Sequence, residues 1–323
     1  MSIDILTAFI EKTPIDMASA WNYADVIDMA SRSLPESFMG DQGPLLRGDQ
    51  YRLWLRWFLE GLVSPHRMAV DPKIGRLEVL ELATKRINAL YTTVELDRRK
   101  KLAEAVTNHI FATISHLRSA AQRDYATTAT RHSLIAASTP PRCYICGYAF
   151  SQEAKDAFLR VKGRAAIKLP PLVDVFRPRG LIERDEKIEI EHVVPVAAGG
   201  SGQHNLRLAC GWCNKHKSDR VSIYESSFMA PRTLSYRIGS HQLNELPNPF
   251  WVIRILALRG KCQHIGGCTR TVKDAELFVS LADWTGSPNP TNLVVYCEDH
   301  DPIQVDRKQS RVDIAKLWQE RRS

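Results

Sequence analysis

Four cysteines arranged as two Cys-x2-Cys pairs are the first residues of this 323-residue chain whose spacing suggests chemistry. Cys143 pairs with Cys146, and Cys210 pairs with Cys213 after a spacer of 63 residues. Two thiolates in such a turn bind one Zn²⁺ at about 2.3 Å, and a second pair completes a closed tetrahedral site. The N-terminus lacks the basic and apolar regions of a secretory signal, and in a reducing cytoplasm clustered cysteines are more often metal ligands than disulfides. The spacing therefore predicts a structural zinc ion.

Between the two pairs lie residues of the types that carry acid–base and metal chemistry. Residues 187–195 alternate polar and apolar side chains and end at a proline, which predicts a strand. Glu191 and His192 are neighbours on it, so their side chains should point to opposite sides. A glycine-rich turn precedes Asn205, and Asn214 directly follows the last cysteine. The predicted order is two strands and a helix, folded around zinc.

In the order of these residues the segment resembles an HNH endonuclease of the McrA-like, zinc-stapled kind. The shared pattern is Cys-x2-Cys, an acid–His pair before a proline, Gly-Gly, Asn-Leu and Cys-x2-Cys-Asn-x2-Lys, and it covers about a quarter of the chain. The resemblance implies that His192 is the general base and that Glu191 and Asn214 bind the catalytic metal. It also implies that Asn205 braces the loop that aims the base. Colicin-type relatives bind the metal through histidines of the final helix, so His216 is an alternative to Asn214.

The reaction that this resemblance implies is hydrolysis of a phosphodiester bond. It requires a deprotonated water and neutralised charge on the phosphate and the leaving oxygen. A histidine near its unperturbed pKa of about 6.5 suits proton removal from water near neutral pH. One hard divalent ion on a carboxylate and an amide oxygen keeps positions open for phosphate and water, so we expect Mg²⁺, with Mn²⁺ as a substitute. The zinc ion would be structural, because thiolates take all four of its positions.

Each of these residues has a plainer interpretation when it is taken alone. A Glu–His pair at a strand end usually lies on the surface or in the core without a chemical role, and an asparagine near glycines is usually part of a turn. A zinc knuckle can also bind nucleic acid without cutting it. The alternative hypothesis is therefore a non-catalytic, zinc-containing nucleic-acid-binding protein. A third hypothesis is an interaction protein whose helical region binds a partner chain.

The spacer between Cys146 and Glu191 is long for a site of this kind. It contains proline-bearing stretches at residues 168–172 and 176–180, which indicate an inserted loop. Such a loop could contact DNA or cover the site, and the sequence leaves both options open.

Charge and hydropathy narrow the class of partner. The formal net charge is +8, and residues 132–234 contain 15 Lys and Arg against 10 Asp and Glu. This excess suits phosphate contacts, although a zinc ion on four thiolates would reduce it. No apolar run approaches the roughly 18 residues of a membrane span, so we expect a cytoplasmic protein without a membrane partner. The expected partner is nucleic acid, and DNA in particular.

The N-terminal third is predicted to be helical. Residues 50–63 are apolar nearly all round, which predicts a buried helix, and residues 77–92 and 98–121 carry apolar stripes at helical spacing. His109 is expected at the polar edge of its stripe rather than as a metal ligand, because no second ligand lies at metal-binding spacing. The sequence leaves open whether this region binds a protein partner or forms a homodimer.

The remaining three cysteines lie in the C-terminal segment and suggest a second zinc site. Cys262, Cys268 and Cys297, with His300, form a set of three thiolates and one imidazole. His264 is an alternative fourth ligand, and three simply buried thiols are the plainer interpretation. The aromatic residues of this segment are expected to pack in the core rather than to stack on bases: Trp251, Trp284 and Tyr296.

These observations predict an α+β chain of three parts. Residues 1–135 would form a helical domain of unknown role, residues 136–234 a ββα-metal HNH domain on the four-cysteine zinc site, and residues 235–323 a small C-terminal zinc-binding domain. The expected activity is metal-dependent endonucleolytic hydrolysis of DNA. Analogy with other HNH enzymes that carry large flanking domains suggests a bacterial restriction or phage-defence effector.

Overall fold

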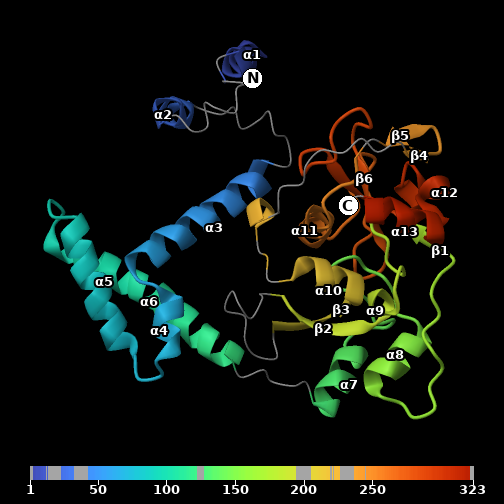
Figure 1. The fold of residues 1–323 in the computed structure, drawn as a ribbon, viewed down its shortest axis with the longest axis horizontal. Helices are drawn as coiled ribbons and strands as arrows, with labels where there is room; N and C mark the ends of the chain where they lie inside the picture. The colour runs from blue at the N-terminus through green and yellow to red at the C-terminus, as the bar shows by residue number, and fades with distance from the viewer. Residues whose placement is uncertain are drawn as a thin grey trace. The chain divides into compact units, whose positions relative to one another are not determined.

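The structure is a computed structural model with mixed helices and small sheets, an α+β architecture (Figure 1). It describes residues 3–11, 13, 23–32, 43–121, 127–193, 205–218, 220, 222–225, 236–243 and 245–320. Packing divides the chain into two units, Met1–Tyr51 and Arg52–Ser323. Within the described ranges, the strands form two-stranded antiparallel sheets. None of the described helices is long and apolar enough to cross a membrane.

The first unit contains helices α1 (Ile3–Glu11) and α2 (Tyr23–Ser31) and the beginning of α3 (Gly43–Leu62), which continues into the second unit. The prediction that residues 50–63 form a helix is confirmed, but the prediction that this helix is buried is wrong. Trp54 and Trp57 are 53% and 60% exposed. The reason is that only the C-terminal end of α3 reaches a described core, through Leu59, Leu62 and Val63. An all-round apolar pattern therefore did not distinguish a core helix from one with exposed aromatic side chains.

A helical core follows, formed by α4 (Pro65–Val70), α5 (Arg76–Leu90) and α6 (Leu96–Ala121). Helix α5 begins with the Glu78 carboxylate accepting from the backbone N–H of Gly75 at 2.9 Å, which satisfies a donor at the helix start. The two predicted helices are confirmed, and their apolar stripes are buried against one another. On α6 the buried positions are Val106, Ile110 and Ile114, whereas His109 is exposed, as expected for a residue at the polar edge.

The predicted ββα order is present in the second unit (Figure 1). Strands β2 (Ile188–His192) and β3 (Leu206–Cys210) are antiparallel, and α10 (Gly211–Lys217) begins directly after β3. The register places Ile188 opposite Cys210 and His192 opposite Leu206. Both the Pro195 end of the predicted strand and the glycine-rich turn lie outside the described residues.

Two short helices lie against this hairpin. Helix α7 (Thr128–Ala136) packs on β3 and on α8 (Gln152–Leu159), and α8 packs on β2. Each is capped by a hydroxyl group: Thr127 accepts from the N–H of Thr130 at 3.1 Å, and Ser151 accepts from the N–H of Ala154 at 3.2 Å. Helix α7 therefore belongs to the same packed body as the hairpin.

The C-terminal segment is built around the hairpin of β6 and β7, which packs against α11. Its remaining elements are short. In chain order, the elements from residue 172 onward that have not yet been given are β1 (Leu172–Asp174), α9 (Glu183–Glu186), η5 (Ile223–Glu225), β4 (Tyr236–Ile238), β5 (His241–Leu243), α11 (Pro249–Arg259), β6 (Leu277–Leu281), β7 (Leu293–Cys297), η6 (Glu298–His300), α12 (Gln304–Arg307), β8 (Lys308–Ser310) and α13 (Arg311–Glu320).

The inserted stretch between the cysteine pairs has two different halves. Residues 173–178 are buried, and β1 pairs with β8, with Leu172 opposite Ser310. Arg307 bridges the two segments, because its guanidinium donates to Asp174 at 3.0 Å and to Asp301 at 2.8 Å. Residues 161–166, by contrast, are exposed. The second half of the insertion is therefore the surface on which the C-terminal segment packs.

Candidate metal centres and active site

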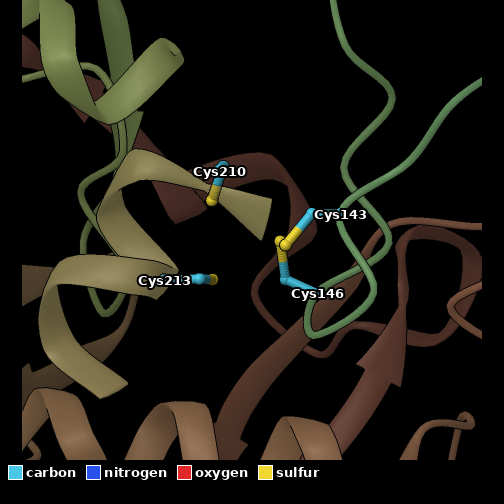
Figure 2. Close-up of side chains that lie close together, drawn as sticks. All are labelled: Cys143, Cys146, Cys210 and Cys213. Carbon is cyan, nitrogen blue, oxygen red and sulfur yellow. The ribbon is translucent and has the colours of Figure 1, made fainter. Parts of the chain in front are cut away.

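The structure brings Cys143, Cys146, Cys210 and Cys213 together as predicted. All four side chains are buried, and their sulfur atoms lie within 4.8 Å of one another. Figure 2 shows Cys143 and Cys146 on a loop facing Cys210 and Cys213 at the start of a helix, with the four sulfurs directed toward a common centre. Thiolates in this arrangement fit a tetrahedral Zn²⁺. Such a set leaves no open position, which suits a structural ion and not a catalytic one.

The turn between the first two cysteines is held by backbone hydrogen bonds. The N–H of Gly147 donates to the carbonyl of Cys143 at 2.8 Å, and the N–H of Tyr144 donates to the carbonyl of Leu208 at 2.9 Å. Gly147 has a φ of +74°, and a Cβ placed there would lie 2.0 Å from the carbonyl oxygen of Ala275. Glycine is therefore required both by the turn and by the contact with the C-terminal segment.

The electrostatic environment favours thiolate at one of the four sulfurs before any metal binds. Burial opposes ionisation of Cys146, but hydrogen bonds from the three neighbouring thiols and the charge of Arg177 hold its pKa well below the usual range. The Arg177 guanidinium is buried and donates to the Cys146 sulfur at 3.2 Å. Burial and contacts with the other thiols raise the pKa values of Cys210 and Cys213 well above the usual range. A bound divalent metal would supply the charge that keeps those two as thiolates.

The second predicted set is also assembled. Cys262, Cys268, Cys297 and His300 each offer a ligand atom, and these atoms lie within 4.8 Å of one another. Nδ1 of His300 is 3.2 Å from the Cys297 sulfur and 3.7 Å from the Cys262 sulfur. The alternative ligand His264 instead stacks on His300, with ring centroids 4.0 Å apart. This set could hold a second zinc ion, with His264 as a neighbour that restricts the ring of the ligand histidine.

Glu191 is buried where β2 packs against α10 (the β2–α10 site), and both of its carboxylate oxygens have partners. Lys217 Nζ donates to Oε1 at 2.6 Å, and the Tyr144 hydroxyl donates to Oε2 at 2.6 Å. Lys217 also donates to the backbone carbonyl of His192 at 3.0 Å. Burial, together with the negative charge of Glu191, raises the pKa of Tyr144, so its hydroxyl stays protonated and remains a donor.

Asn214 lies on α10 at the same β2–α10 site, about one helical turn before Lys217. Its side-chain nitrogen donates to Glu189, which lies two residues before Glu191 on the same face of β2. Arg184 also binds Glu189, at 2.8 and 3.3 Å. Because its nitrogen is held by Glu189, the carbonyl oxygen of Asn214 is the atom that a cation would use.

The other predicted site residues lie on or next to the same strands and helix. His192 is the last residue of β2 and is partly exposed, on the strand position next to the buried Glu191. The backbone carbonyl of Asn205 accepts from the N–H of Val193 at 2.9 Å, which ties the end of β2 to the start of β3. The ring of His216 packs on Trp212 with centroids 4.6 Å apart.

The fit of these residues to a catalytic divalent ion is partial. The Glu191 carboxylate and the Asn214 amide oxygen are ligand types that suit Mg²⁺. Within the ranges that the structure describes, however, the two cysteine sets are the only clusters of three or more Cys, His, Asp or Glu ligand atoms. Glu191 and Asn214 would hold Mg²⁺ with water and substrate oxygens completing the shell, provided that Lys217 and Glu189 release them.

Sequence reasoning did not find Tyr144 and Glu189, and it noted Lys217 only as the last residue of the motif, without a role at the site. A signal existed for each. Glu189 shares a strand face with Glu191 by the two-residue period, and Lys217 shares a helix face with Asn214 by the three-residue spacing. Tyr144 lies between Cys143 and Cys146, so the turn that brings these two cysteines to the second pair also brings Tyr144 beside the strands.

Comparison with known proteins supplies no relative. No protein-family model matches the chain, and no curated protein or solved structure is significantly similar to it.

Proposed function

We propose that this protein is a metal-dependent HNH endonuclease that hydrolyses phosphodiester bonds in DNA. The observation that carries the proposal is the contact of Lys217 with the Glu191 side chain at the end of β2, next to His192, from a helix that begins inside a four-cysteine cluster. In this arrangement the cluster holds the helix against the strand that carries Glu191 and His192.

In the proposed reaction His192 removes a proton from the attacking water. Glu191 and Asn214, with His216 as the alternative ligand, bind Mg²⁺ or Mn²⁺. When bound, that ion would polarise the phosphate and neutralise charge on the leaving oxygen. Asn205 ties the strand ends beside the base. Two structural zinc ions would hold the scaffold.

A basic segment supports nucleic acid as the substrate. Residues 157–173 contain four cations and no acidic residue, and Lys162, Arg164 and Lys168 are exposed. Within the described part of the chain these three side chains form no salt bridge. The segment follows α8, which packs on β2, so a duplex at His192 could extend over these cations. This is the exposed half of the insertion.

The biological role that we propose is a bacterial restriction or phage-defence effector that acts in the cytoplasm. Helices outside the ββα region would then bind a partner chain or a second copy.

One observation favours the alternative, a zinc-containing nucleic-acid-binding protein without catalysis. Both oxygens of Glu191 are already engaged by Lys217 and Tyr144, and Asn214 is engaged by Glu189. Buried pairs of this kind are also found where they only stabilise a fold.

Cleavage of supercoiled plasmid tests the proposal. We expect the wild type to cut with Mg²⁺ or Mn²⁺ and not with EDTA, and His192→Ala to bind DNA without cutting it. His109→Ala is the matched control, because this histidine is exposed on α6 and should leave cleavage unchanged. No cutting by the wild type in either metal, with DNA binding retained, would favour the non-catalytic alternative.

A further inference from the structure

The β2–α10 site contains a buried lysine that the proposed reaction does not use. Lys217 is 9% exposed, and its ammonium lies 2.6 Å from Oε1 of Glu191. Glu191 is itself only 5% exposed. A buried ammonium is unfavourable unless a negative charge and hydrogen bonds compensate it, so this lysine depends on its contacts with β2.

Both contacts of the ammonium are to residues that would do the chemistry. It binds the side chain of Glu191 and the backbone carbonyl of His192. A divalent cation in the proposed reaction would bind the same carboxylate. Two cations would then share one buried carboxylate, and each raises the electrostatic cost of the other.

We propose that Lys217 is the internal counter-ion of Glu191 in the metal-free protein and that it competes with the catalytic divalent cation for this carboxylate. The inference rests on the proposed function, since it requires that Glu191 binds a metal. Its physical basis is that a buried carboxylate must be compensated when no metal is present. The lysine compensates the charge of Glu191 and lets β2 and α10 pack together in the absence of the ion.

Tyr144 differs from Lys217 in the effect that it should have on the metal. Its hydroxyl donates to the other oxygen of Glu191, but it carries no charge and does not repel a cation. Tyr144 is therefore a positioning residue that orients the carboxylate. Lys217→Met should strengthen metal binding, whereas Tyr144→Phe should weaken it or leave it unchanged.

Titration of the zinc-loaded full chain with Mn²⁺, followed by electron paramagnetic resonance of the free ion, measures this competition without any cleavage. We expect wild type to bind Mn²⁺ at a site that Glu191→Gln removes. Lys217→Met should lower the dissociation constant of that site at least about tenfold, the smallest effect expected from a unit charge close to a divalent ion. Lys217→Arg, which keeps the charge, should stay near the wild-type value.

Lys215→Met is the matched control for charge. Lys215 lies on the same helix and loses the same unit charge, but it is exposed, so its effect on Mn²⁺ affinity should be much smaller than tenfold. An equal effect of the two substitutions would show that only net charge matters and would overturn the inference.

Folding of the variants also distinguishes a lysine that a metal can replace from a purely structural ion pair. If Lys217→Met folds only with Mn²⁺ present, the metal has taken the place of the lysine, as proposed. If it stays unfolded at saturating Mn²⁺ while the double variant Lys217→Met/Glu191→Gln folds, the pair is structural and the inference fails. A wild-type Mn²⁺ site that Glu191→Gln removes but Lys217→Met does not strengthen overturns the inference alone. Absence of any Glu191-dependent site overturns both the inference and the proposed metal.

Discussion

Replacement of Arg177 by methionine should destabilise the four-cysteine centre more than any surface substitution. The guanidinium is 2% exposed and contacts the sulfur of Cys146 at 3.2 Å, the carboxylate of Glu276 and the ring of Phe278 at 5.8 Å. Methionine fills much of the same volume, so the loss is mainly that of the charge and its hydrogen bonds.

The size of the destabilisation follows from the Glu276 carboxylate, which is left without its partner. Breaking a buried ion pair by removing one partner costs about 3–5 kcal/mol. The Glu276 side chain is 24% exposed and can regain some water, so the lower end, about 3 kcal/mol, applies. At roughly 2–4 °C per kcal/mol for a body of this size, the melting temperature should fall by about 6–12 °C. Loss of a charge-assisted hydrogen bond to a zinc-bound sulfur, about 1.5–3 kcal/mol, should weaken zinc affinity by roughly ten- to a hundredfold.

Thermal unfolding, with released zinc read by a chromophoric chelator, measures both effects. Arg270→Met is the control, because Arg270 is 51% exposed, its pair with Asp274 is 3.9 Å long, and such pairs contribute about 0–1 kcal/mol. The melting temperature and zinc release of Arg177→Lys should lie between those of the two methionine variants, since lysine keeps the charge but not the forked geometry. If Arg177→Met melts and releases zinc like Arg270→Met, the contact with Cys146 does not stabilise the centre and our reasoning is refuted.

Other predictions concern the two metal sets, a glycine and the basic segment. Purified protein should contain about two equivalents of zinc by elemental analysis, and Cys297→Ser should lose one, whereas one equivalent in the wild type would remove the second site. Cys210→Ala should cost folding itself, seen by circular dichroism, because structural zinc binding is folding free energy; a folded, active variant would contradict this. Gly147→Ala should lower the melting temperature, since its Cβ would lie 2.0 Å from the carbonyl of Ala275, and an unchanged value would show that the turn adapts. Neutralising three exposed cations should reduce the slope of log affinity for DNA against log salt by up to about 2.7, and an unchanged slope would place the phosphate contacts elsewhere. The cations are Lys162, Arg164 and Lys168.

The two metal sets and the ββα order were predictable from the sequence because their information is local. A Cys-x2-Cys turn places two thiolates at the spacing of one metal ion whatever surrounds it. Polar–apolar alternation likewise predicted β2, and apolar stripes predicted α5 and α6, since period and burial are linked within a single element. His300, which spacing favoured over His264, is the histidine whose ring nitrogen lies with the three thiols.

Burial and the partners of the site residues were decided by the tertiary structure. The apolar surface of α3 predicted burial, but Trp54 and Trp57 are exposed, and an apolar pattern does not state what packs against it. The insertion divides into an exposed basic half and a buried half only because β8, some 130 residues later, pairs with β1.

The sequence by itself thus determined which cysteines, together with His300, can form the two metal sets and which helices and strands present the candidate site residues. Only the tertiary structure placed Lys217 and Tyr144 on Glu191 and Glu189 on Asn214. The physical reason is that ligand spacing and periodicity act over a few residues. The compensation of a buried charge depends instead on side chains that packing brings together from distant parts of the chain.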